Sequence, residues 1–282
     1  EAARTLRAAR VARAVIRGGA AAALGGGGGV VPGLLIFPEF CNEEDESVLV
    51  ECLDAEAPPW RAEQAGVPTR YFSKQFGVVP ALRPVRCTRP PDPACGEAAF
   101  PTVGPLARAA RRLAQPGRPW ERVLRDFRPN EANANDYRRH EGHFLAMHWD
   151  DRKFYSGPIC VLSLLAGATM TFRRGAAQRS NLRRRPSGAE TEAKGDGQDE
   201  EERVVRVDLP ARSLMVTTGA ARFEWQHGIP DPGDFAGPRR LGLIFRRARL
   251  CPSRQPRSGC AAAASAAAAV AAGGQSEEAP PS

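Results

Sequence analysis

Six short apolar runs, bounded by turn residues, occupy the second half of the chain. They are Ala132 to Tyr137, Ile159 to Leu165, Ala168 to Phe172, Val204 to Leu209, Ser213 to Thr218 and Arg240 to Arg247. Runs of this length and spacing are typical of the strands of a β-sandwich or barrel rather than of a parallel sheet. Two helices are expected before them, from Asn42 to about Leu53 and from Pro105 to Leu113. The predicted fold class is mainly β with flanking helices (α+β), built on a double-stranded β-helix (jelly-roll) core.

The first predicted helix begins at a typical cap. Asn42 precedes four acidic residues, Glu43 to Glu46, which suit the positive end of a helix dipole. The Asn42 side chain is therefore expected to cap the first turn. Helical periodicity then places Val48, Leu49 and Cys52 on the inward face.

Composition divides the chain into one domain and three segments without a core pattern. We expect one folded domain over residues 30–250, interrupted at 175–202 by a disordered insertion that is basic first and acidic later. Residues 1–29 and 251–282 lack periodic large apolar residues, so a disordered extension and a disordered low-complexity tail are expected. What remains, roughly 190 to 200 residues, is enough to bury one substantial core.

The N-terminal extension also has features of a targeting sequence. Ala2 to Gly18 is rich in Ala and Arg, lacks acidic residues, and as a helix would place Leu6, Val11, Val15 and Ile16 roughly on one side. An organelle transit peptide has this composition. A solvated low-complexity extension explains it equally well, and the residues alone leave both interpretations open.

The net charge of the chain is +8 and its pI is about 9.5, which suits a polyanionic partner such as nucleic acid. Many arginines lie in the extension and the insertion, where they say little about a folded surface. Charge therefore permits a nucleic-acid partner without requiring one.

Cysteine usage predicts a reducing compartment. The seven cysteines are odd in number and scattered, contain no Cys-x-x-Cys pair, and follow no secretory apolar segment. We expect an intracellular location, in the nucleus or cytoplasm, with organelle targeting as the alternative. No stretch approaches the ~18 to 20 uninterrupted apolar residues of a membrane span, so no membrane partner is expected. The sequence leaves the oligomeric state unknown.

The four histidines make a histidine-based metal site easy to examine. In an extended segment His148 and Asp150 point to the same side, because side chains two apart share a face. One more imidazole would complete a two-His-one-carboxylate facial triad, which leaves iron positions open for a cosubstrate and dioxygen. His227 is the distant candidate among the histidines. A surface loop that carries His-x-Asp by chance remains the alternative.

A strand-like run near the C-terminal end of the domain carries two arginines. Period-two alternation from Arg240 to Arg246 places both arginines, with Gly242 and Ile244, on one face. Two arginines facing a barrel interior would be costly unless they met anions. A dicarboxylate supplies one, because its far carboxylate takes a bidentate fork from arginine. The alternative is a sheet edge where both arginines reach solvent.

Together these segments resemble the AlkB family of Fe(II)- and 2-oxoglutarate-dependent dioxygenases, most closely its branch known as AlkB homologue four. The likeness covers about half of the chain strongly, and more weakly Gln64 to Gly77. The matching residues are Asn135-Asp136-Tyr137, His148-Trp149-Asp150-Asp151, Leu162-Ser163-Leu164, Met170-Thr171-Phe172, Leu209-Pro210-Ala211-Arg212-Ser213-Leu214, Gly219-Ala220-Ala221-Arg222, Trp225-Gln226-His227 and the Arg240 to Arg246 spacing.

The resemblance implies a catalytic iron held by His148, Asp150 and His227. It also implies cosubstrate contacts: a salt bridge from Arg240 to the distal carboxylate of 2-oxoglutarate, hydrogen bonds from Asn135 and Tyr137, and a place for Arg246 near the reaction centre. Asn133 is an alternative to Asn135, because two more residues separate Asn135 from His148 than in the bacterial enzyme. Gly242 and Ile244 also depart from the family pattern, since bacterial members carry polar residues there.

The resemblance further implies an oxidative demethylase that uses Fe(II), 2-oxoglutarate and O2 and releases formaldehyde from N-methyl groups on protein lysine or nucleic acid. A methylated protein is slightly favoured as substrate. Substrate contacts are expected from Arg70, Tyr71 and Phe76, with Phe72 and Lys74 beside them. The alternatives are a nucleic-acid repair or methyladenine demethylase, a stable hydroxylase and a non-catalytic binding scaffold.

Five residues near these motifs receive simpler interpretations. Trp225 and Phe223 are expected in the barrel core, and His140 and His143 at the surface. Asp151 either orients a metal ligand or faces water.

Overall fold

The computed structural model describes residues 31–55, 58–62, 71–81, 87–174 and 203–250, together with the backbone of two short strands before them. The helices are α1 (Glu43–Ala55), α2 (Gly104–Leu113), α3 (Glu121–Leu124) and α4 (Gly219–Phe223), with 3-10 turns η1 (Pro93–Cys95), η2 (Arg139–Glu141) and η4 (Pro232–Asp234). The strands are β1 (Val11–Ala14), β2 (Ala22–Ala23), β3 (Leu34–Phe37), β4 (Arg61–Ala62), β5 (Phe72–Gly77), β6 (Val79–Ala81), β7 (Cys87–Arg89), β8 (Glu131–Arg138), β9 (Leu145–His148), β10 (Tyr155–Leu164), β11 (Ala168–Arg174), β12 (Arg203–Leu209), β13 (Leu214–Thr217), β14 (Gln226–Ile229) and β15 (Arg239–Ala248).

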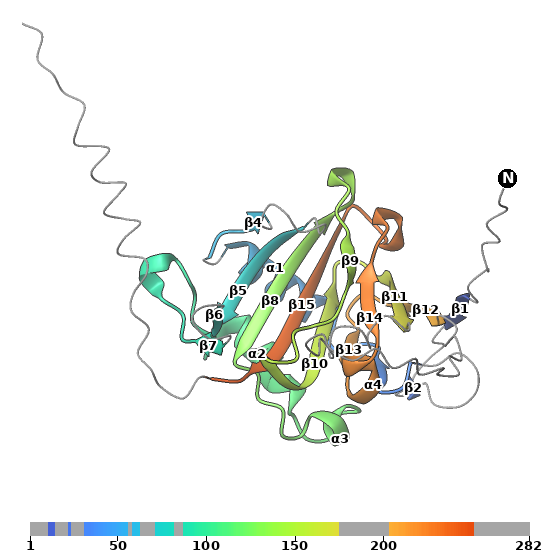
Figure 1. Ribbon diagram of the computed structural model, residues 1–282. Helices are drawn as coiled ribbons and strands as arrows, with labels where there is room; N and C mark the ends of the chain where they lie inside the picture. Colours follow the sequence, from blue (N-terminus) through green and yellow to red (C-terminus); the bar gives the residue numbers. More distant parts are fainter. Residues whose placement is uncertain are drawn as a thin grey trace, which may run out of the picture.

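Two facing sheets form the centre of the molecule (Figure 1). The larger sheet has the order β2-β3-β13-β10-β15-β8-β5-β4 and the smaller sheet the order β1-β12-β11-β14-β9. The eight strands β8 to β15 contribute four neighbours to each sheet, and every pairing among them is antiparallel. This pairing is that of a double-stranded β-helix, so the predicted fold class is confirmed.

The larger sheet separates two apolar cores. On its inner face, Ile159, Val161 and Ile244 pack with Phe172 and Trp225 of the smaller-sheet side. On its outer face, Leu241, Leu243 and Phe245 pack against α1 and α2. Alternate residues of one strand therefore enter different cores, as period-two geometry requires. The helices cover the outer face and leave the space between the sheets for the site.

All six predicted strand runs are strands, and both predicted helices form. Asn42 caps α1, because its Oδ1 accepts a hydrogen bond of 2.7 Å from the backbone nitrogen of Asp45. The inward face of α1 differs from the prediction. Val48 is 38% exposed, and the buried positions are Glu46, Leu49 and Leu53.

Glu46 takes an inward position on α1 because its carboxylate has two partners there. One oxygen accepts a hydrogen bond of 2.7 Å from the backbone nitrogen of Leu165, and the other lies 3.2 Å from Arg212 Nη1. Because these partners satisfy the carboxylate, Glu46 can lie on the buried face of α1, a position that apolar periodicity alone does not give to an acid.

The predicted low-order segments fall largely outside the described residues. This holds for the insertion at 175–202, for the tail at 251–282 and for most of 1–29, so these remain predictions. Within the extension, the backbone of Val11–Ala14 forms a strand parallel to β12, and the targeting interpretation stays a prediction. No helix of the described part is long and apolar enough to span a membrane.

The described cysteines include both thiols and a bonded sulfur. Cys41 and Cys160 carry buried free thiols, whereas Cys95 is disulfide-bonded. The reducing compartment expected from cysteine usage therefore stays a prediction.

The outer core supplies a direct stability test. Leu243 is fully buried between the larger sheet and the helices, whereas Leu250 is 59% exposed. Leu243→Ala should lower the free energy of unfolding by about 2–5 kcal/mol, because it removes buried methyl groups and leaves a cavity. Leu250→Ala should change it by less than about 0.5 kcal/mol. Urea unfolding measures both, and equal effects would show that this core is not the stabilising one.

Candidate active site

The two histidines of the proposed triad face each other across neighbouring strands. β9 and β14 pair with His148 opposite His227, and the ring centroids lie 4.5 Å apart. Gly228 permits this pairing, because a Cβ there would lie 2.7 Å from the carbonyl oxygen of Leu145 on β9. Phe172, paired with His227 on its other side, extends the row into the inner core.

Asp150 joins the histidines from the loop after β9. Its Oδ2 lies 3.5 Å from His227 Nε2, and its Oδ1 accepts a hydrogen bond of 3.1 Å from Arg246 Nη2. The loop itself is fixed by buried Arg222, whose two terminal nitrogens each donate a 3.0 Å hydrogen bond, to the carbonyl oxygens of Asp150 and Asp151. The predicted set of two imidazoles and one carboxylate is therefore adjacent in space.

The chemistry of these donors fits a divalent iron. His148 Nδ1 lies 2.9 Å from the carbonyl oxygen of Ala146, which can accept only, so Nδ1 carries the proton and Nε2 keeps its lone pair for a metal. No three His, Cys, Asp or Glu side chains in the described ranges already surround one point as metal ligands do. In the structure, Arg246 holds one of the Asp150 oxygens, so a metal must share that carboxylate with a guanidinium.

Burial sets the protonation states that a metal requires. Burial, with His148 nearby, lowers the pKa of His227 to about 3, so this imidazole is neutral at pH 7. Burial alone would raise the pKa of the Asp150 carboxyl, but Arg246 and the two histidines lower it to about 2. Both groups can therefore bind a cation at neutral pH without first losing a proton.

Arg240 is a buried cation without a carboxylate partner among the described residues. It is 1% exposed, its Nη2 donates a 3.1 Å hydrogen bond to Ser163 Oγ, and its guanidinium lies 5.4 Å from the centre of the Tyr137 ring. Burial lowers its pKa, and the interaction that opposes this effect comes from Tyr137 rather than from a carboxylate. A buried charge of this kind requires an anion.

Gly242 makes room for that arginine. It lies between Arg240 and Ile244 on the inner face of β15, and a Cβ there would come within 3.1 Å of Arg240 Nη1. Its departure from the family pattern thus has a steric reason in this chain.

The other expected cosubstrate residues line the same interior. Asn135 and Tyr137 follow Glu131 and Asn133 on one face of β8, opposite the inner face of β15. Asn135 Nδ2 donates a 3.2 Å hydrogen bond to the Tyr137 hydroxyl, and the buried Oδ1 of Asn135 has no hydrogen-bond partner among the described residues. The Oδ1 of Asn133 is likewise unpartnered, so either asparagine can face a ligand.

The residues expected to contact substrate lie in different parts of the structure. Tyr71 lies beside the site, with its ring 5.4 Å from that of Tyr137. Phe76 is wrong as a substrate contact: it is 3% exposed and packs in the outer core, because it faces the helices with Ala132. Arg70 lies outside the described residues, so its role stays a prediction.

Lys74 and Phe72, which were expected beside these substrate residues, also make other contacts. Lys74 shares the outer face of β5 and donates a 2.5 Å hydrogen bond to the Leu53 carbonyl. Phe72 contacts Arg138 and His143 instead of a substrate-facing surface.

Of the residues expected to be simple core or surface positions, some lie where they were predicted and others do not. Trp225 is in the inner core as expected, but Phe223 is 42% exposed at the end of α4. His140 is exposed, whereas His143 is buried because its Nδ1 accepts a 3.1 Å hydrogen bond from the backbone of Arg138. Asp151 Oδ1 accepts hydrogen bonds from the backbone nitrogens of Lys153, at 2.6 Å, and Phe154, at 2.9 Å. Asp151 therefore shapes the turn after Asp150.

Three site residues were not predicted to have roles: Arg222, Ser163 and Glu131. Arg222 and Ser163 lie within the matched segments, so their place in a family pattern was the available signal. Glu131 precedes the first matched segment, and its only signal is an acid at the start of an apolar strand.

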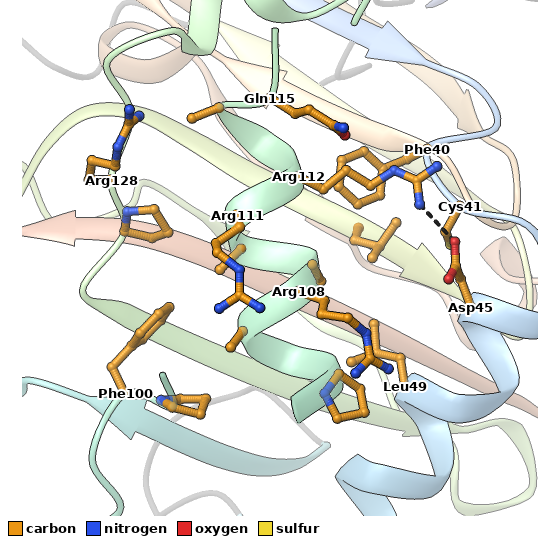
Figure 2. A pocket seen from close by; sticks show the side chains of 18 of the residues that line it. Phe40, Cys41, Asp45, Leu49, Phe100, Arg108, Arg111, Arg112, Gln115 and Arg128 are labelled. Atoms are coloured by element: carbon orange, nitrogen blue, oxygen red, sulfur yellow. Dashed lines mark hydrogen bonds and ion pairs between the residues drawn. The ribbon is translucent and has the colours of Figure 1, made fainter. Parts of the chain in front are cut away.

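A hollow of about 840 Å³ lies apart from these residues, around α2 (Figure 2). Its lining includes Arg108, Arg111, Arg112 and Arg128, and its acid, Asp45, already pairs with Arg112 at 2.7 Å. None of the three proposed iron ligands lines it. The hollow belongs to the helical side of the larger sheet, and the chemistry is expected between the sheets.

Comparison with known proteins defines the class. The family model described as "2OG-Fe(II) oxygenase superfamily" matches residues 33–246, so the chain belongs to this superfamily. The description of this superfamily names Fe(II) and 2-oxoglutarate, the metal and the cosubstrate expected from the sequence.

Within that class the chain is similar to AlkB homologues. It is similar to "Alpha-ketoglutarate-dependent dioxygenase alkB homolog 4" of Homo sapiens, with 30% identity over 206 residues, and to the Mus musculus protein of the same description, with 26% identity over 205 residues. Each match covers 70% of this chain and 62% of the relative, so the chain spans less than two thirds of these relatives. The solved structure "The structure of OsALKBH1" covers 77% of this chain and 99% of its own, at 16% identity and a TM-score of 0.49.

The Arg222 anchor can be tested apart from activity. Arg222→Met removes two buried, charge-assisted hydrogen bonds and should lower the free energy of unfolding by about 3 kcal/mol. The matched control is Arg247→Met, because Arg247 is exposed on β15 and should cost less than about 0.5 kcal/mol. Urea unfolding of the two variants gives the difference; equal values would mean that Arg222 does not hold the Asp150 loop.

Proposed function

We propose that His148, Asp150 and His227 bind the catalytic Fe(II), and that Arg240 binds the distal carboxylate of 2-oxoglutarate. The observation that carries this proposal is Arg240 itself, a buried guanidinium on the inner face with no carboxylate beside it in the described part of the chain. A dicarboxylate that reaches from the triad to Arg240 supplies the missing anion. Asn135 and Tyr137 would hydrogen-bond that cosubstrate beside Arg240.

The proposed reaction is the oxidative demethylation of N-methyl groups. When bound, iron and 2-oxoglutarate supply an oxidant for a C–H bond of the methyl group, with succinate and carbon dioxide as products. The hydroxymethyl product then loses formaldehyde. The protein keeps His227 neutral, keeps Asp150 ionised, and surrounds them with the apolar inner core, which excludes water.

A methylated lysine in a protein is our leading substrate. Tyr71 and Tyr137 form an aromatic pair beside the site, and aromatic faces bind methylated ammonium groups through cation–π attraction. A nucleic-acid substrate is the second candidate, supported by the arginines around the α2 hollow, which could contact a phosphate backbone (Figure 2).

The cosubstrate anchor can be tested with kinetics. Arg240→Gln should raise KM for 2-oxoglutarate by about tenfold to 100-fold with a smaller change in kcat, because it removes a charge-assisted pair. The variant should also lose the preference for 2-oxoglutarate over a 2-oxo acid without a distal carboxylate. Arg239→Gln is the control, since Arg239 pairs with Asp54 at 2.7 Å and Asp136 at 2.9 Å on the other face. An unchanged KM in Arg240→Gln would contradict the assignment.

The reaction and its substrate class can be measured together. Purified protein with Fe(II), 2-oxoglutarate and O2 should release formaldehyde from methyl-lysine peptides, and His148→Ala should abolish this release while His140→Ala leaves it intact. Matched methylated oligonucleotides form the second arm. Release from oligonucleotides alone would identify a nucleic-acid demethylase. Succinate without formaldehyde would indicate a stable hydroxylase, and neither product a binding scaffold.

A further inference from the structure

Arg246 lies between two carboxylates at the edge of the site. On β15 it is paired with Glu131 on β8, and its Nη1 lies 3.1 Å from Glu131 Oε1 and 3.4 Å from Oε2. Its Nη2 donates a 3.1 Å hydrogen bond to Asp150 Oδ1. The guanidinium also lies 4.8 Å from the centre of the Tyr155 ring, which supports its plane. One cation therefore joins a proposed iron ligand to a second acid.

Glu131 has no solvent to stabilise its charge. It is 1% exposed, and burial raises its pKa to about 7, although Arg246 opposes that shift. Burial alone would lower the pKa of Arg246, but Glu131 and then Asp150 raise it. A buried ion pair between strands is costly, and apolar residues in place of both Glu131 and Arg246 would often be as stable. The cost indicates a role beyond holding the strands together.

The role follows from the geometry of arginine. A guanidinium can donate two parallel hydrogen bonds to one carboxylate. With Glu131 on Nη1, Arg246 offers Nη2 to Asp150 and leaves Oδ2 of that carboxylate toward His227. Without the Glu131 charge, Arg246 would be free to form a bidentate pair with Asp150 and compete with a metal for both oxygens.

We propose that Glu131 is a positioning residue that fixes Arg246 on one oxygen of Asp150 and so keeps the carboxylate available to the iron. This inference rests on the proposed assignment of Asp150 as an iron ligand. Residues that orient metal ligands typically change metal affinity by about 10- to 100-fold when they are replaced.

The experiment measures metal binding without turnover. Co(II) is titrated into the metal-free protein, and its dissociation constant is obtained from the Co(II) absorption bands. Glu131→Gln should weaken Co(II) binding by about 10- to 100-fold, and the metal-free variant should unfold at or below the wild-type temperature, because Arg246 loses one of its two carboxylate partners. The matched control is Glu46→Gln, a buried acid paired with Arg212 on the helical side, which should lower stability and leave the Co(II) constant unchanged.

A double-mutant cycle tests whether Glu131 acts through Arg246. In an Arg246→Met background, Glu131→Gln should change the Co(II) dissociation constant by less than about twofold, because the competing guanidinium is gone. An equal loss in both backgrounds, or wild-type affinity in Glu131→Gln alone, would overturn the inference. If wild-type protein binds no Co(II), or if Asp150→Ala binds it as tightly, the iron-site proposal fails and the inference with it.

Discussion

The pairing of β14 with β9 places His227 opposite His148, and the site depends on it. These strands are four residues each, and their register brings together two imidazoles that are far apart along the chain. Gly228 allows the close approach of the two backbones, and Arg222 fixes the loop that carries Asp150. A shift of one residue in either strand would turn one imidazole to the opposite face, so that His148, Asp150 and His227 would no longer be adjacent.

The inner face of β15 presents two arginines in opposite electrostatic situations. Arg240 is buried with a serine hydroxyl and an aromatic ring, and it lacks a carboxylate among the described residues. Arg246 is bonded to two carboxylates, one of them on the metal side. Arg240, which lacks a carboxylate partner among the described residues, suits a dicarboxylate that binds and leaves. Arg246, which already has two carboxylate partners, suits a fixed element of the site. This contrast supports the proposal that one strand serves both cosubstrate and metal.

Much of the architecture follows from local patterns. The six strand runs and the cap at Asn42 were predictable, because alternation and capping depend on neighbours in the chain. The errors share a different cause. Val48 was expected to face inward and Phe76 to contact substrate, but the elements packed around them gave each a different environment. His143 was expected at the surface but is buried, with a hydrogen bond from the Arg138 backbone that no periodicity encodes. β9 and β14 were too short to be recognised as strands.

The sequence by itself determined which residues share a face: period two along β15 places Arg240, Gly242, Ile244 and Arg246 together, whatever that face meets. Only the tertiary structure decided what each of them meets. The antiparallel register with β8 places Glu131 against Arg246 and Tyr137 beside Arg240, and the loop after β9 adds Asp150. Alternation is a property of one strand, whereas register is a property of two, and electrostatic partners are set by register.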